Sequence, residues 1–185
     1  DLSGICDLNG NAWEWAAGLR IVDGEIQIIQ HNDAALATAD LSASSTLWKA
    51  ITADGSLVAP GTSGTIKLDW RNSKITLVTD ALTGKSDTGR GTGFTSLATT
   101  LSTVPQILYG IGMYPKNPGG DYGGDDMYMI NSGERIPIRG GSWNNTSNAG
   151  VSKVNLNNVR GNRNGNIGRR SAFPHKRMSA YEQKV

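Results

Sequence analysis

The residues best suited to binding chemistry are asparagines, and they are concentrated between Ser142 and Asn166, where nine of twenty-five residues are Asn. Each Asn side chain presents one hydrogen-bond acceptor and two donors, and Asn favours turns over the interior of helices and sheets. We therefore expect an exposed, irregular stretch of backbone that recognises a partner through many polar contacts. The alternative is a solvated polar loop of low complexity.

Residues capable of covalent, acid–base or metal chemistry are few and scattered. Cys6 is a single cysteine, so no disulfide can form within the chain. His31 and His175 lie far apart in the sequence without a carboxylate constellation, which favours neither a general base nor a metal site. The segment 115–126 carries three aspartates, but their spacing matches no EF-hand loop, and a solvated turn is favoured over a calcium site. The sequence thus predicts no enzyme.

Apolar residues and glycines recur through the Asn-rich stretch and are expected to hold it on a core. The apolar positions are Trp143, Val151, Val154, Leu156, Val159 and Ile167. Trp143 is predicted to be buried, so its replacement by Ala is expected to cost about 3 kcal/mol or more, whereas replacing Asn157 or Asn164 is expected to cost little. Gly140 and Gly141 are placed where the chain bends into the stretch.

The remaining elements form a loop-rich fold of short strands and few helices. Residues 19–29 read as a hairpin around Asp23-Gly24, and residues 65–79 read as a second hairpin. A helix is predicted over 103–113, with Ser102 or Thr103 as its cap. Strands at 127–130 and 135–139 are expected to pair with each other. Trp13 and Trp15 would share one face of a strand as core anchors, with a sugar-stacking platform as the alternative.

Three motifs carry a resemblance to a known family. They are DLNGNAWEW at 7–15, IPIRGGSW at 136–143 and NIGRRSA at 166–172. In this order they resemble the C-type-lectin-like fold shared by formylglycine-generating (sulfatase-modifying) enzymes and the variable proteins of diversity-generating retroelements. The similarity to the variable proteins is closer, because LRIVDGEIQII, STLWKAI, DGSLVAPGT, VPQIL, SNAGV and LNNVR also fit. The chain departs from that family where Gly168 is followed by two arginines instead of Phe-Arg.

The resemblance implies an α+β, C-type-lectin-like fold with short antiparallel strands. It also implies that residues 1–185 form one domain, the C-terminal part of a longer protein, with a variable region at about 139–171. In this family, reverse transcription miscopies adenines of a template repeat, and the product overwrites the 3′ end of the gene. The sulfatase-modifying chemistry requires a reactive cysteine pair in the C-terminal part of the domain, and only Cys6 is present.

The genetic code gives the resemblance a test at single residues. An Asn codon altered only at its two adenines can encode Ser, Thr, Gly, Asp, Arg, His or Tyr but never a stop, whereas Lys153 cannot arise in this way. The expected ligand contacts are Ser142, Asn144, Asn145, Thr146, Asn148, Ser152, Asn155, Asn157, Asn158, Asn162, Arg163, Asn164 and Gly165. The expected supporting residues are Trp13, Trp15, Gly140, Gly141, Trp143, Leu156, Val159 and Ile167.

Composition and resemblance together predict the partners. A formal net charge of +2 does not favour nucleic acid, and no apolar run is long enough for membrane insertion. The resemblance implies a host-cell surface protein or glycan as target, and a protein on a phage tail or a bacterial surface that could form a trimer. No cofactor is expected, apart from the prospect of a structural Ca²⁺ near Asn9 and Glu14. The alternative function is an undiversified carbohydrate-binding module.

Overall fold

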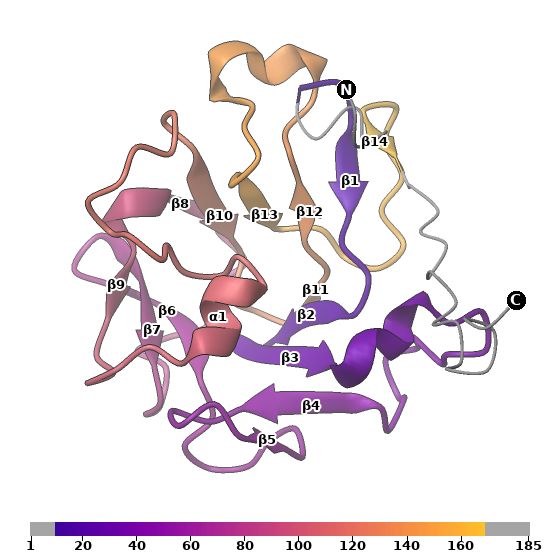
Figure 1. The fold of residues 1–185 in the computed structure, drawn as a ribbon, viewed down its shortest axis with the longest axis vertical. Helices are drawn as coiled ribbons and strands as arrows, with labels where there is room; N and C mark the ends of the chain where they lie inside the picture. Colours follow the sequence, from indigo (N-terminus) through magenta and orange to yellow (C-terminus); the bar gives the residue numbers. More distant parts are fainter. Residues whose placement is uncertain (1–9, 169–185) are drawn as a thin grey trace, which may run out of the picture.

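Two sheets built from short strands make up most of this computed structural model, which describes residues 10–168. The six-stranded sheet has the order β14 (Ile167–Gly168), β1 (Trp13–Trp15), β12 (Ile138–Arg139), β13 (Val154–Leu156), β10 (Asp126–Met129) and β8 (Arg90–Gly93). The eight-stranded sheet has the order β11 (Glu134–Arg135), β2 (Leu19–Val22), β3 (Glu25–Ile29), β6 (Lys67–Arg71), β7 (Lys74–Val78) and β9 (Ala98–Thr99), with β4 (Trp48–Ile51) beside β3 and β5 (Leu57–Val58) beside β4. Figure 1 shows the smaller sheet above the larger one.

Helices within the described range are few and short. They are α1 (Gln106–Gly110) and the 3₁₀ segments η1 (Gln30–Ala35), η2 (Phe94–Ser96) and η3 (Trp143–Asn148). The predicted helix over 103–113 is therefore shorter than expected, and its cap is Pro105 rather than Ser102 or Thr103. A residue that precedes proline avoids the helical region, which prevents an earlier start. The fold is mixed and sheet-rich with few helices, as the sequence predicts at this coarse level.

Both predicted hairpins are present. In the first, Asp23 and Gly24 have φ of 47° and 79° and join β2 to β3 as a two-residue loop. In the second, Asn72 and Ser73, also at positive φ, join β6 to β7. Positive φ at both central residues gives the turn twist that suits a hairpin.

The predicted pairing of 127–130 with 135–139 is wrong. β10 instead lies between β8, to which it is antiparallel, and β13, to which it is parallel. The chain between them is held elsewhere, since the Asn131 side chain accepts from the Ser86 N–H at 2.9 Å and donates to the Gly84 carbonyl at 3.1 Å. The next strands then separate, with β11 on β2 and β12 between β1 and β13.

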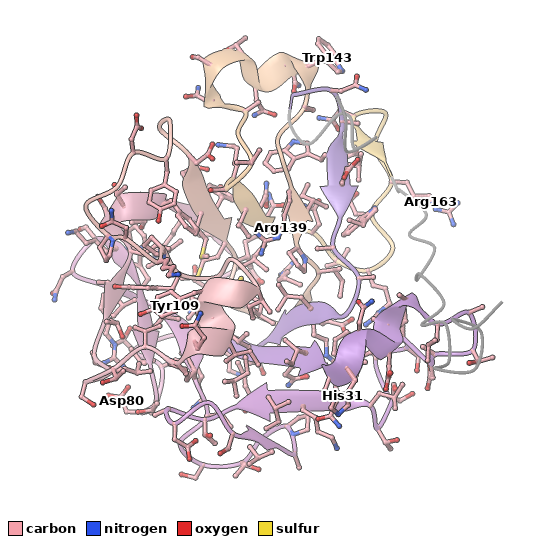
Figure 2. The ribbon with its side chains drawn as sticks, viewed as in Figure 1. His31, Asp80, Tyr109, Arg139, Trp143 and Arg163 are labelled. Carbon is pink, nitrogen blue, oxygen red and sulfur yellow. The ribbon has the colours of Figure 1, made fainter. Side chains whose placement is uncertain are left out.

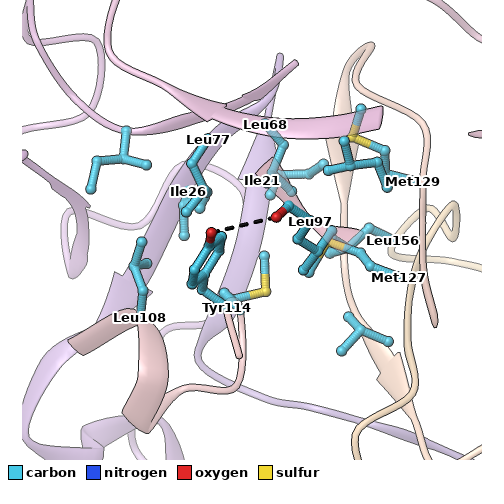
Figure 3. Packing of buried hydrophobic residues seen from close by; sticks show 14 of the residues in the cluster. Ile21, Ile26, Leu68, Leu77, Leu97, Leu108, Tyr114, Met127, Met129 and Leu156 are labelled. Atoms are coloured by element: carbon cyan, nitrogen blue, oxygen red, sulfur yellow. Dashed lines mark hydrogen bonds between the residues drawn. The ribbon is translucent and has the colours of Figure 1, made fainter. Parts of the chain in front are cut away.

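One cluster of buried side chains joins the two sheets and α1 (Figure 3). Ile21 and Ile26 come from the larger sheet, Leu108 from α1, and Met127 and Leu156 from the smaller sheet. Because Leu156 is fully buried there, β13 fixes the middle of the Asn-rich stretch to the core of the molecule.

Candidate binding surface

The chain enters the Asn-rich stretch through two glycines that follow β12. Gly140 and Gly141 have φ of 86° and 74°, a region that other residues seldom adopt. A Cβ on Gly141 would also lie 2.9 Å from the Cα and Cβ of Ala149. These glycines therefore turn the chain into η3 and let its two ends pack closely, as expected of supporting positions.

Ser142 lies inside the turn rather than on its surface. Its side chain is fully buried, and its Oγ is 2.6 Å from Asn144 Oδ1 and 3.0 Å from Asn145 Oδ1. Asn145 Oδ1 also accepts from the Ser142 N–H at 2.8 Å, and Asn166 Nδ2 donates to Ser142 Oγ at 3.3 Å. The prediction that Ser142 contacts a ligand is therefore wrong, because this residue joins the two ends of the stretch.

Trp143 points away from the core. Its exposed fraction is 71%, while its backbone N–H donates to the Asn11 carbonyl at 3.0 Å. Figure 2 shows it at the outer end of the molecule. The prediction that Trp143 is buried is wrong: burial of Ser142 inside the turn leaves the next side chain facing solvent. Val151 and Val159 are also exposed, whereas Val154 and Leu156 are buried and Ile167 is half-buried.

Two aspartates outside the stretch hold residues 150–153. Asp125 Oδ2 accepts from the Ser152 N–H at 2.8 Å, and a Cβ on Gly150 would lie 1.9 Å from Asp125 Oδ1. Lys153 Nζ is 2.6 Å from Asp126 Oδ1, and Lys153 is buried. Burial raises the pKa of Asp125, although the Ser152 N–H opposes this. The interpretation of these aspartates as a solvated turn is thus wrong for Asp125, which is buried.

The asparagines around β13 are held by local contacts. Asn155 Oδ1 accepts from the Asn157 N–H at 2.9 Å, and both side chains are half-buried. Asn158 is buried, its Oδ1 accepts from Asn162 Nδ2, and its Nδ2 has no acceptor among the described residues. Its carbonyl also accepts from the Ile136 N–H at 2.9 Å. Asn158 is therefore a structural residue, and its prediction as a ligand contact is wrong.

Arg160 ties the part of the stretch that follows β13 to Glu134, which belongs to β11 in the larger sheet. Its Nη2 and Nε lie 2.6 and 3.0 Å from the Glu134 oxygens, and Arg20 Nη1 lies 2.7 Å from Glu134 Oε1. Arg20 in turn stacks on Trp48 at 4.2 Å from the ring centroid. Burial raises the pKa of Glu134, but the hydrogen bonds from Arg160 and Arg20 outweigh burial and hold it below its ordinary value.

The chain then runs back towards η3 and enters β14. The Trp13 N–H donates to the Asn166 carbonyl at 2.9 Å, and Trp13 is buried while Trp15 is half-buried. Exposed residues of η3 lie at this end of the molecule, and Arg163, in the turn before β14, lies on the adjoining flank (Figure 2). Six of the residues expected to contact a ligand are exposed, and we call them the display face: Asn144, Thr146, Asn148, Arg163, Asn164 and Gly165.

A cavity of about 320 Å³ lies elsewhere, between the β1–β2 connection and η1. Arg139 is the one ionisable residue in its lining, and its guanidinium donates to the Ile111 carbonyl at 2.6 Å and the Gly112 carbonyl at 3.3 Å. Burial lowers the pKa of Arg139 to about 10. With no acid, base or nucleophile in its lining, this cavity offers no catalytic group.

Within residues 10–168 no three His, Cys, Asp or Glu side chains gather as metal ligands. Asn9, Cys6 and His175 lie outside the described residues, so the expected Ca²⁺ position near Asn9 and Glu14 stays a prediction. No helix in the described part of the chain is long and apolar enough to cross a membrane. The sequence matches no protein-family model and no curated protein.

Proposed function

We propose that this protein binds a target through the display face and that its fold is C-type-lectin-like, of the kind varied by diversity-generating retroelements. Residues at about 139–171 are the segment that such an element rewrites. The target is a molecule on the surface of a host cell, and the protein is carried on a phage tail or on a bacterial surface, as a trimer in the first case.

The observation that carries this proposal is the separation of backbone support from exposed side chains. Much of the support comes from residues that adenine changes in an Asn codon do not produce or that lie outside the stretch, such as Lys153, Leu156, Asp125 and Glu134. The buried Ser142 and Asn158 also support the backbone, although an Asn codon can supply both. The display face, by contrast, consists of residues that an Asn codon can supply. Exchange of these side chains leaves those supports in place, and the one side-chain hydrogen bond it removes among the described residues is that from Ser142 Oγ to Asn144 Oδ1, so binding specificity can change without loss of the fold.

The composition of the display face also favours recognition over catalysis. Asn, Thr and Gly provide adaptable hydrogen bonding, which is typical of variable binding loops. Few rigid aromatic residues are present, so each copy is expected to bind weakly, and several copies on one particle would supply strength through avidity.

A pair of displayed libraries tests the proposal. In the first, the codons for Asn144, Asn148, Arg163 and Asn164 are randomised to the amino acids that Asn codons reach through adenine changes. In the control, exposed residues in the loops that flank β4 and β5, Thr46, Ala53 and Ser63, are randomised in the same way; these two strands lie at the opposite end in Figure 1. Both libraries are selected on intact bacteria.

We expect the first library to remain folded and to yield binders, because its positions are exposed and the buried supports stay in place. The control library is expected to stay folded but to yield few binders. Equal yields from the two libraries, or general unfolding of the first, would contradict the proposal.

A further inference from the structure

Trp143 lies in η3 together with the display-face residues Asn144, Thr146 and Asn148, yet it is not one of the residues that adenine mutagenesis can change. Tryptophan has the single codon TGG, which contains no adenine. Its side chain is 71% exposed, and its backbone is fixed by the Asn11 carbonyl and by the buried Ser142 on its N-terminal side. An exposed indole on a rigid backbone loses little conformational freedom on binding, which is the property of an anchor residue.

The stretch that contains Trp143 is polar and nearly uncharged. The stretch 142–166 contains no Asp or Glu. Two of its three cations are neutralised, Lys153 by Asp126 and Arg160 by Glu134, which leaves Arg163 without an ion pair among the described residues. The exposed neighbours Asn144 and Asn148 offer amide donors and acceptors.

We propose that Trp143 is a constant stacking platform for a sugar ring, and that the varied residues around it select among glycans. The apolar C–H face of a pyranose packs on an aromatic face, while its hydroxyl groups pair with side-chain amides. This inference deepens the proposed function and rests on it for the identity of the varied residues.

A protein target fits the same surface less well. The core of a protein interface is apolar and rich in aromatic side chains, and binding energy concentrates there. Besides Trp143, the exposed large apolar residues of the stretch are Val151 and Val159. A single exposed indole with amide side chains beside it instead suits a sugar, which offers an apolar ring face for the indole and hydroxyl groups for the amides.

The test begins with the full chain, tetramerised to gain avidity, on an array of bacterial surface oligosaccharides. Wild type is compared with Trp143→Ala and Trp143→Phe, and the unfolding temperature of each is measured first. We expect binding to at least one glycan, at least about tenfold weaker for Trp143→Ala, and intermediate for Trp143→Phe, which keeps an aromatic face.

Indole N–H signals in a ¹H–¹⁵N spectrum then locate the contact. The chain has five tryptophans, and the signal missing from Trp143→Phe belongs to Trp143. Addition of the bound glycan is expected to shift this signal and to leave the signal of the buried Trp48 in place.

Three results would overturn the inference: no glycan bound above the Trp143→Ala background, a bound glycan that leaves the Trp143 signal unmoved, or binding to bacteria that survives periodate but not protease. The proposed diversification is judged separately by the nucleotide sequence of the gene. A template repeat without glycan binding would refute the stacking platform alone, and glycan binding without a repeat would refute diversification alone.

Discussion

Replacement of Trp143 and of Leu156 should have opposite consequences for stability and for binding. Leu156 is fully buried in the shared core, and its truncation to Ala should cost about 2 to 5 kcal/mol. Trp143 has about three tenths of its surface covered. For an indole side chain this is roughly 70 Å², which at about 25 cal/mol/Å² gives an upper bound of about 1.8 kcal/mol.

We therefore expect Trp143→Ala to lose about 1 kcal/mol and Leu156→Ala to lose clearly more. Urea unfolding followed by far-UV circular dichroism measures both without relying on tryptophan emission, and equal m-values would show that the unfolded states are comparable. For a domain of this size, 1 kcal/mol corresponds to about 2–4 °C in the unfolding temperature. If Trp143→Ala destabilised the protein as much as Leu156→Ala, the assignment of Trp143 to the exposed surface would be refuted.

Three further predictions concern the contacts that hold the stretch. Glu134→Ala leaves the guanidinium of Arg20 buried without its carboxylate and should cost about 2 kcal/mol, whereas Arg160→Ala should cost under about 1 kcal/mol. If urea unfolding gave the reverse order, Glu134 would not be the residue that anchors Arg20 and Arg160. Because the folded pKa of Glu134 is below its unfolded value, its contribution to folding stability is present above about pH 4.3 and is lost as the pH falls through the folded pKa. The stability difference between wild type and Glu134→Gln should therefore shrink from about pH 6 to pH 3, and a constant difference would contradict this. Gly150→Ala forces Asp125 to move and should cost about 1–3 kcal/mol, while Gly161→Ala, with open space around the added Cβ, should change the stability by less than about 0.5 kcal/mol. Similar unfolding temperatures for the two variants would rule out the close contact between Gly150 and Asp125.

The hairpins were predictable because their signal is local. Asp23-Gly24 lies between two β-rich runs, and the turn geometry follows from residues that accept positive φ. The sheet-rich character and the low helix content also follow from the frequent turn residues. The six-stranded sheet was less accessible, since β10 lies beside β8 and β13, and no local pattern encodes such non-local pairs.

The display face was predictable in part. Exposed Asn144, Asn148 and Asn164 follow from the density of amides, but Ser142 and Asn158 have the same chemistry and are buried. Their burial depends on partners reached through the fold, namely Asn166 for Ser142 and the backbone of Ile136 for Asn158. Composition alone cannot separate an amide that pairs within the protein from one that faces solvent.

The error over Trp143 has a different origin. An aromatic residue in a polar stretch is usually a core residue, and this expectation is sound on average. Here the Gly140-Gly141 turn decides the outcome, because it buries Ser142 and leaves Trp143 facing outwards. The role of Asp125 was missed for the same reason as the burial of Ser142 and Asn158, since its partner Ser152 is distant in sequence.

The central claim is that residues at about 139–171 are rewritten while the supporting contacts stay fixed, and the nucleotide sequence of the gene's 3′ end and its downstream flank tests it most directly. We predict a near-duplicate of the codons for this segment, which differs from the gene only where the copy has adenine and lies beside a reverse-transcriptase reading frame. The differences should fall at display-face codons and spare those for Gly141, Trp143, Lys153 and Leu156. Absence of such a copy, or differences that also fall where the copy lacks adenine, would contradict the account.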